Sequence, residues 1–345
     1  MRKPFELAGV TILPGQRQIV DIPLSMMSDH TPATLSVQVI HGRREGPAIF
    51  VSAAVHGDEI IGVEIVRRLA RTTALRRIAG TILLIPIVNT FGFIGHSRYL
   101  PDRRDLNRCF PGSTKGSLAA RLAHLFMSEV VHRCDYGIDL HTAAVHRVNL
   151  PQLRIDLSDR KASELAEAFG PPVVLDAAFR EGSLRHAARE QGVPVMVFEA
   201  GEALRLDESA IRVGVKGVLR VARHLDMIRK GTVHVDDVNP PVAKKSTWLR
   251  AAEGGLLRTK CKIGEFVRKG AILGLISDPF GERETEVRAM VAGLIIGRAN
   301  MPVVNQGDAL FHIAALSQAD ASDATLQAIE ENFESDPLFD DDEIV

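Results

Sequence analysis

The sequence predicts an α/β domain, with a mixed, largely parallel sheet and helices on both faces, followed by a small all-β domain. Two observations lead to this fold class. Up to about residue 228, apolar runs of strand length alternate with segments of helical periodicity, the pattern of parallel strands connected by helices. Beyond about residue 250 the helical pattern stops, and short apolar runs alternate with glycine-rich turns. We therefore expect domains at residues 1–240 and 241–316, and a tail at 317–345.

In several segments of the first domain, the apolar residues recur with the period of a strand or of a helix. Residues 80–88 are apolar on both faces, as in a central strand, and residues 34–40 and 193–198 are shorter candidate strands. A helix of about three turns is expected to end near Arg71. Further helices are expected at residues 118–131, 162–169 and 184–190, and a linker at residues 230–241.

The second domain contains two related halves, residues 254–276 and 292–313. Each half runs from a glycine through a strand to a V-x-x-G turn and a final strand. Two such halves can form a small sandwich of interlocked hairpins. In the tail we expect one short helix at residues 324–333 and a disordered, solvated end at residues 340–343.

The composition is that of a soluble globular protein, since 46% of the 345 residues are hydrophobic and 25% are charged. The formal net charge is −1, but residues 320–343 hold ten acidic residues and no Lys or Arg, so the remaining chain sums to about +9 (−1 minus −10). A surplus of this size, spread along the chain, favours anionic substrates weakly and does not indicate nucleic acid.

Apolar segments and cysteines indicate the cellular compartment of the protein. No apolar run approaches the ~20 residues of a membrane span, and the N-terminus lacks the apolar core of a signal peptide. The three cysteines match no C-x-x-C pattern, so neither a disulfide framework nor a thiolate metal site is indicated. We therefore expect a cytoplasmic protein without membrane or nucleic-acid partners.

Candidate chemistry begins where the apolar run of residues 49–55 ends, at His56-Gly-Asp-Glu59. The apolar pattern then resumes, as when a buried strand leads through a loop into a helix. An imidazole and a carboxylate three residues apart, with Gly57 allowing a sharp turn, can converge on one divalent cation. Ordinary loop chemistry is the other interpretation of this motif, and a metal site needs a third ligand.

The third ligand is best sought at His141, after the apolar segment of residues 136–138. A histidine at the end of a second strand of the same sheet would lie beside the first pair of ligands, and Asp139 is placed to orient its ring. Two histidines and one glutamate leave a fourth position on zinc open for water, as in catalytic sites. The sequence therefore predicts a zinc site formed by His56, Glu59 and His141.

Two further segments are candidates for the same site. The loop at residues 98–108, RYLPDRRDLNR, contains four arginines that can bind a substrate carboxylate or an oxyanion, although a solvated charged loop is the alternative. Glu199 ends the strand predicted at residues 193–198 and suits a general base. Glu202 is a competitor, but a strand end positions a side chain more reliably than the loop beyond it.

Four motifs occur together in one order: HGDE at 56–59, the loop at 98–108, DLHT at 139–142 and FEAG at 198–201. With them the chain resembles the succinylglutamate desuccinylase/aspartoacylase family, deacylases related to zinc carboxypeptidases, over about residues 30–315. The resemblance implies a carboxypeptidase-like α/β domain that hydrolyses the amide bond of an N-acyl amino acid. It also implies that the second domain is a biotinyl/lipoyl-like barrel-sandwich.

The resemblance assigns a role to each candidate residue. His56, Glu59 and His141 hold one Zn2+ per subunit, and Glu199 is the general base and acid. Asn107 and Arg108 bind the carboxylate end of the substrate, Arg98 polarises the scissile carbonyl, and Arg185 makes a further carboxylate contact.

The chain departs from the family pattern at three places. Arg103-Arg104 stands where Asp-Gly-Arg is more usual, so the tip of that loop is expected to be stiffer or more basic. No tyrosine follows Tyr136, so the late tyrosine with which aspartoacylase contacts its substrate has no counterpart. The hairpin at residues 278–285 has no lysine, so the second domain is not a biotin or lipoate carrier. We expect a lid, a spacer or an oligomerisation module.

The function that follows is a zinc-dependent amidohydrolase with a small anionic N-acyl amino acid as substrate, in a possible homo-oligomer. A variant of this function acts on a modified diamino acid, such as an acetylated breakdown product of a compatible solute. Two alternatives stay open at this point. One is a metallocarboxypeptidase that cleaves short peptides with the same ligands. The other is a zinc-bound binding or regulatory protein without catalysis.

Overall fold

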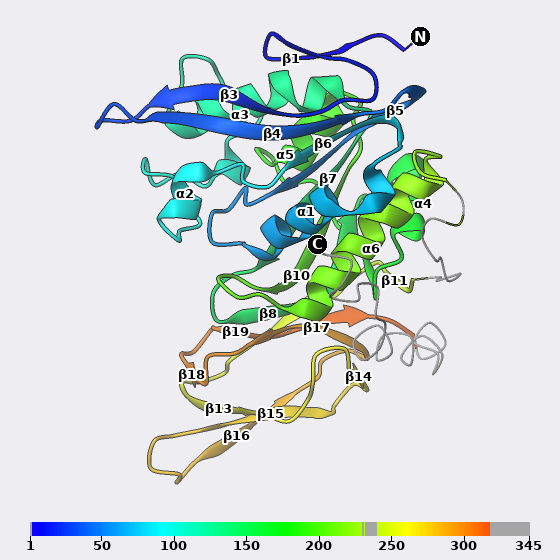
Figure 1. The fold of residues 1–345 in the computed structure, drawn as a ribbon. Coiled ribbons are helices and arrows are strands. Elements are labelled where there is room, and N and C mark those ends of the chain that lie inside the picture. Colours follow the sequence, from blue (N-terminus) through cyan, green and yellow to red (C-terminus); the bar gives the residue numbers. More distant parts are fainter. Residues whose placement is uncertain (1, 230, 232–239, 318–345) are drawn as a thin grey trace.

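The computed structural model describes the chain except for residues 1, 230, 232–239 and 318–345 (Figure 1). The acidic tail, its expected helix and most of the expected linker lie outside the described residues. Among the described helices, none combines the length and the apolar character needed to cross a membrane.

Four parallel strands form the centre of a large mixed sheet, in the spatial order β10, β7, β5, β6. Their bounds are Val195–Glu202, Tyr136–Ala143, Arg44–Ala53 and Ala79–Ile85. Antiparallel strands continue the sheet on both sides. On one side lie β4 (Pro32–His41) and β3 (Arg17–Met26), and on the other β8 (Arg147–Ile155), with β9 (Val174–Asp176) beside it. The predicted mixed sheet with a parallel centre is confirmed.

Helices cover both faces of this sheet (Figure 1). On one face α1 (Ile61–Arg71), α4 (Arg160–Phe169) and α6 (Glu208–His224) share a hydrophobic core. On the other face α3 (Leu118–Glu129) and α5 (Leu184–Glu190) share a second core. The shorter elements are the hairpin β1 (Phe5–Leu7) and β2 (Val10–Ile12), helix α2 (Thr90–Ile94), and the 3-10 helices η1 (Thr73–Leu75), η2 (Leu106–Arg108) and η3 (Val131–Arg133).

Most predicted elements lie where the sequence placed them, and the differences have local causes. The strand expected to reach Val88 ends at Ile85, because Pro86 has no N–H for the ladder. The strand expected at residues 193–198 runs instead over Val195–Glu202. The sequence places His224 in a helix but gives that helix no bounds, and the structure shows it as α6, which Asp207 caps through a bond from the Ala210 amide (3.0 Å).

The C-terminal strands form a small sandwich of two sheets, as predicted. One sheet contains β13 (Gly255–Thr259), β15 (Ile272–Ser277), β16 (Glu284–Arg288) and β18 (Val303–Val304). The other contains β12 (Ser246–Arg250), β14 (Phe266–Val267), β17 (Gly293–Ala299) and β19 (Ala309–Ala315). Apolar side chains such as Leu273, Ile295 and Phe311 fill the space between the sheets.

The sandwich is not a detached body, because β17 pairs with β8 of the α/β region. The large sheet therefore continues through β17 and β19 to β12, and Figure 1 shows β17 and β19 directly below β8. Strand β11 (Val242–Ala243) also pairs with β9. The boundary expected at residue 240 stays a prediction, and the two regions share one sheet.

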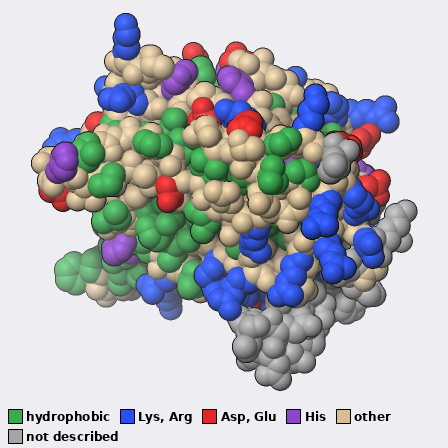
Figure 2. All heavy atoms as spheres, turned by 45° about the horizontal axis from the view of Figure 1, so that its top comes forward, with side chains coloured by type: hydrophobic (Ala, Val, Ile, Leu, Met, Phe, Trp, Pro, Cys, Tyr) green, Lys and Arg blue, Asp and Glu red, His purple; other side chains and the backbone are tan. Residues whose placement is uncertain are grey.

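Charged side chains are unevenly distributed over the surface. Figure 2 shows one face on which Lys and Arg side chains gather toward the lower right, with few Asp or Glu side chains among them.

Candidate active site

Three neighbouring parallel strands bring the candidate residues to one edge of the sheet. Strand β5 leads into the loop that carries His56 and Glu59, and β7 and β10 carry His141 and Glu199. His141 and Glu199 are directly paired in the register of these two strands. Because parallel strands end at the same edge, residues far apart in sequence meet there. Gly57 fits this loop because a Cβ would lie 2.0 Å from the backbone of Gly92.

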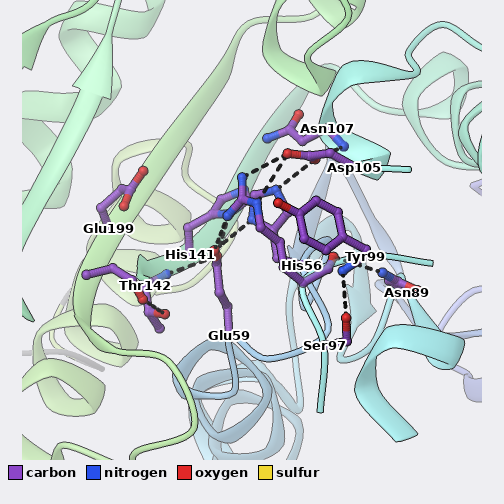
Figure 3. Close-up of polar contacts among 12 residues, drawn as sticks. His56, Glu59, Asn89, Ser97, Tyr99, Asp105, Asn107, His141, Thr142 and Glu199 are labelled. Carbon is purple, nitrogen blue, oxygen red and sulfur yellow. Dashed lines mark hydrogen bonds and ion pairs between the residues drawn. The ribbon is translucent and has the colours of Figure 1, made fainter. Parts of the chain in front are cut away.

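The ring nitrogens of two histidines converge on one carboxylate (Figure 3). Nδ1 of His56 lies 2.7 Å from Oε1 of Glu59, and Nδ1 of His141 lies 2.7 Å from Oε2. The possible ligand atoms of the three residues all lie within 4.8 Å of one another, and all three side chains are buried. Two imidazoles and a carboxylate are suitable ligands for a divalent transition metal, so this group could hold one.

The remaining ring nitrogens are held by two aspartates. Nε2 of His141 lies 2.7 Å from Asp139, which confirms the predicted contact, and Nε2 of His56 lies 3.1 Å from Asp105. Asp139 also accepts a bond from the Ser52 hydroxyl (2.8 Å). Carboxylates in these positions fix the ring orientation and the tautomer of a ligating histidine. Both Nδ1 atoms therefore face Glu59, as a shared metal ion would require.

The charges in this cluster shift one another's pKa values. Burial alone would raise the pKa of Glu59, but the charges of His56 and His141 outweigh burial and lower it. Burial alone would lower the pKa of His141, but Asp139 and Glu59 raise it. Glu59 is therefore ionised at neutral pH, the form in which a carboxylate binds a metal.

Arg98 lies at the edge of this cluster. Its guanidinium donates to Glu59 (3.2 Å) and to Asp105 (3.0 Å). Asp105 therefore links Arg98 to His56 and also caps η2 through the Asn107 amide (2.8 Å). The side chain is close to the cluster, and its predicted contact with a scissile carbonyl stays a prediction.

The cluster opens into a cavity of about 450 Å3. All the site residues predicted from the sequence line it, from the loop, the strand ends and α5. Its wall is strongly cationic, because the arginines that line it are Arg98, Arg108, Arg147, Arg154, Arg180 and Arg185. Such a wall favours anionic ligands.

Asn107, Arg108 and Arg185 all line the cavity, and the segments that carry them are in contact. The Leu184 amide donates to Oδ1 of Asn107 (2.9 Å), which joins η2 to the start of α5. Gly182 packs against the Arg108 carbonyl, where a Cβ would come within 2.6 Å.

Arg185 is the buried member of this group. One terminal nitrogen donates to the carbonyls of Ala177 and Ala178 (2.8 and 2.7 Å), and Nη1 has no partner among the described residues. Burial, with the nearby charge of Arg154, lowers its pKa to about 10. A buried guanidinium with an unpaired donor favours a carboxylate ligand.

Glu199 and Glu202 have different surroundings, although both belong to β10. Glu199 lines the cavity, accepts a bond from the Asn149 side chain (3.0 Å) and lies 3.6 Å from Arg154. Glu202 instead accepts bonds from the His146 amide and the Asn300 side chain, each 2.8 Å long. Of the two carboxylates, Glu199 is the one that faces the cavity.

Four residues near the site were not singled out from the sequence. Asp105 had a usable signal, because an aspartate two residues before Asn107 suits a helix cap. Asn149 and Arg154 belong to β8, which was not predicted. Trp248 lines the cavity from β12, in the second region. Its position depends on a strand pairing that no local pattern indicates.

Comparisons with known proteins identify the family of the chain. A family model described as the succinylglutamate desuccinylase/aspartoacylase catalytic domain matches residues 45–225, just over half of the chain. The N-alpha-acetyl-L-2,4-diaminobutyric acid deacetylase of Halomonas elongata is 25% identical over 328 residues, which cover 91% of this chain and 94% of that protein.

Solved structures have the same fold. The product-bound ectoine utilization protein EutE (DoeB) from Ruegeria pomeroyi is 23% identical, with a TM-score of 0.77, covering 87% of this chain and 95% of that one. A succinylglutamate desuccinylase/aspartoacylase from Rhodobacter sphaeroides is 24% identical, with a TM-score of 0.77, covering 88% and 94%. The expected carboxypeptidase-like fold with its C-terminal strands is therefore confirmed.

Proposed function

Because the chain belongs to the succinylglutamate desuccinylase/aspartoacylase family, we propose that it is a zinc-dependent hydrolase that releases a carboxylic acid and a free amino acid from an N-acyl amino acid. The observation that carries the proposal is the convergence of His56, Glu59 and His141 beside Glu199, in a cavity lined by arginines. Family membership supports the reaction class, and the side chains support the assignment of roles.

His56, Glu59 and His141 would hold the metal. The donor set fits zinc, since both Nδ1 atoms face a carboxylate while Asp105 and Asp139 hold the opposite ring nitrogens. Three protein ligands leave room for a further ligand, as in catalytic rather than structural sites. When bound, such a metal supplies Lewis acidity and makes water a stronger acid at neutral pH.

In the proposed reaction, Glu199 transfers the proton. It takes a proton from the attacking water and delivers it to the leaving nitrogen. The Asn149 amide and Arg154 contact both of its oxygens and so limit its orientation. Arg98 lies within 3.2 Å of Glu59 and is assigned to the carbonyl oxygen, where charge develops during attack.

Asn107, Arg108 and Arg185 hold the carboxylate of the amino acid. The unpaired Nη1 of Arg185 and the shared position of the three residues support this role. Fixing one end of the substrate places the scissile bond and lowers the entropic part of the barrier.

For the substrate, the diaminobutyrate derivative named for the Halomonas relative is the first candidate, since that protein aligns with 91% of the chain. An acetylated diamino acid carries a carboxylate, which the arginines that line the cavity would bind. We also propose that the protein is cytoplasmic and acts without membrane or nucleic-acid partners.

A substrate panel tests the reaction class. Zinc-loaded protein is incubated with Nα-acetyl-L-2,4-diaminobutyrate, with N-acetyl and N-succinyl forms of aspartate and glutamate, and with unacylated dipeptides, while free amine is followed. Release from acylated amino acids, lost in a His56→Ala variant, is the expected result. Release from the dipeptides alone would assign the protein to the metallocarboxypeptidases instead. No release from any compound, with zinc bound, would contradict the proposal.

A further inference from the structure

A row of paired residues connects the C-terminal strands to the candidate base. Trp248 of β12 is paired with His312 of β19, which is paired with Gly297 of β17. Gly297 is in turn paired with Asn149 of β8, whose side chain donates to Glu199 (3.0 Å). Opposite residues in antiparallel strands point to the same face of the sheet. The row therefore leads along one face from the second region to the cavity.

Trp248 is held firmly in this row. Its ring is stacked on His312, with centroids 4.6 Å apart and planes 11° from parallel. The guanidinium of Arg147 lies 5.6 Å from the centroid of the indole. At Gly297 a Cβ would come within 3.1 Å of Asn149 and His312 and 3.4 Å of Trp248, so the absence of a side chain lets these groups approach. An aromatic ring packed in this way presents a fixed wall.

Trp248 lines the same cavity as the candidate ligands and Glu199. The lining residues of this cavity include two groups that are held by different contacts. Asn107, Arg108 and Arg185 form the first group, and contacts between η2 and the start of α5 join the segments that carry them. Trp248 and Arg147, on strands β12 and β8, form the second group, and the row of paired residues connects it to Asn149 and Glu199.

We propose that Trp248 forms the subsite for the acyl group and limits its length, so that the C-terminal strands supply a specificity-determining residue. The inference rests on the proposed function. In an N-acyl amino acid the acyl group and the carboxylate lie on opposite sides of the scissile amide bond. With the carboxylate at Asn107 and Arg108 and the scissile carbonyl beside Glu199, the acyl group is left to the second group of lining residues, Trp248 and Arg147. The flat edge of an indole suits the methyl and methylene groups of a short acyl chain.

The first part of the test varies the acyl group on one amino acid. Formyl, acetyl, propionyl and butyryl derivatives are compared in the wild type, Trp248→Ala and Trp248→Phe. Each methylene in an apolar subsite changes kcat/KM by about tenfold or more, so the ratio of butyryl to acetyl should rise at least about tenfold in Trp248→Ala. Trp248→Phe, which keeps an aromatic ring, should change the ratio less. Selectivity among amino acids with the acetyl group fixed should change less than about twofold.

Phe280→Ala is the matched control, since Phe280 lies in the C-terminal region but is 89% exposed, in the turn between β15 and β16. It should leave the butyryl-to-acetyl ratio unchanged.

The second part uses fluorescence, because Trp248 is the only tryptophan of the chain. In Glu199→Gln, which should bind without turnover, an N-acyl amino acid should change the tryptophan emission saturably, and the deacylated amino acid should change it far less. If the wild type hydrolyses N-acyl amino acids but Trp248→Ala keeps its acyl selectivity within about twofold, the inference is overturned and the proposed function stands. An emission change equal for both ligands also overturns it. If the wild type hydrolyses no acylated amino acid, the proposed function itself fails.

Discussion

The α/β region and the C-terminal strands bury polar side chains very differently. Among the described residues, the buried polar and charged side chains belong to the α/β region with the single exception of His312. Burying a polar group is costly unless it is paired, so such groups are retained where chemistry or a network requires them. In the α/β region several of them surround the strand ends at His56 and His141. The exception in the C-terminal strands stacks on Trp248, at the edge of the same cavity.

Because of this difference, we expect substitutions in the two regions to have different effects on activity and on stability. Changes at the strand ends should remove chemistry and leave the fold intact. Changes in the C-terminal core should lower stability and leave the chemistry of the folded protein intact. The junction at Trp248 and His312 should affect both.

The largest effect is expected for Glu199→Gln. Loss of a general base and acid should lower kcat by about 10³-fold or more, since proton transfer contributes about 10²–10⁴-fold. The melting temperature and the zinc content should stay near those of the wild type. Glu202→Gln is the matched control, because this carboxylate belongs to the same strand but contacts His146 and Asn300. Equal losses in both variants would contradict the assignment of the base.

Phe311→Ala tests the opposite region. Phe311 is fully buried between the two sheets of the sandwich, so its truncation should cost about 3–5 kcal/mol of the free energy of unfolding. At low temperature, kcat and KM of the folded variant should match the wild type. Urea unfolding and steady-state kinetics measure the two quantities. A large fall in kcat with unchanged stability would refute the separation of the two regions.

Asp139→Asn should weaken the metal site without abolishing it. Asp139 holds Nε2 of His141, and loss of such a partner typically reduces metal affinity by 10–100-fold. Zinc titration against a competing chelator gives the affinity. Asp135→Asn, near the other end of the strand, serves as the control and should bind zinc as tightly as the wild type. An unchanged affinity in Asp139→Asn would show that this contact does not support the ligand.

His312 should make stability depend on pH. Burial, with the charge of Arg154, lowers its pKa to about 3 from the ordinary 6.5. As the pH falls through 6.5 the unfolded chain takes up the proton first, so stability present above that pH is lost between 6.5 and about 3. At about pH 5 this histidine alone should cost about 2 kcal/mol. His312→Phe should lose correspondingly less stability between pH 7 and 5 in urea unfolding, and an identical loss would contradict the burial of a neutral ring.

The smallest effect is expected in the loop at residues 98–108. Arg103 has a φ of 62°, in the left-handed region that favours glycine. Arg103→Gly should relieve this strain, while the greater freedom of glycine in the unfolded chain offsets part of the gain. We expect a net gain below about 1 kcal/mol in urea unfolding, with no gain for Arg103→Ala. A glycine variant less stable than the wild type would contradict the expected strain.

The sequence alone was sufficient for the residues that occupy strand ends. The change from apolar run to polar motif locates His56, Glu59, His141 and Glu199, and parallel strands then bring them together without knowledge of any long-range contact. Helix periodicity likewise predicted α1, α3, α4 and α5 within a few residues.

The features that the sequence does not predict, β8 and the position of Trp248, depend on strand pairing. β8 is difficult to recognise from the sequence, because Asn149, Gln152 and Arg154 interrupt its apolar pattern. Asn149 and Arg154 line the cavity. Trp248 reaches the cavity only through β17, which joins β8 to the C-terminal strands across about 150 residues of sequence. No local propensity encodes the pairing of β17 with β8, so the sequence alone predicts the second region as a separate module. Only the order of strands in the sheet shows that this region contributes to the cavity.

Zinc content measured together with hydrolysis tests the central claim most directly. The full chain is loaded with zinc, freed of unbound metal and analysed for metal per chain, and the release of free amine from an N-acyl amino acid is followed on the same sample. We predict one zinc per chain in the wild type, with both the metal and the activity lost in His141→Ala and after chelation. Activity that persists in a metal-free sample would contradict the account.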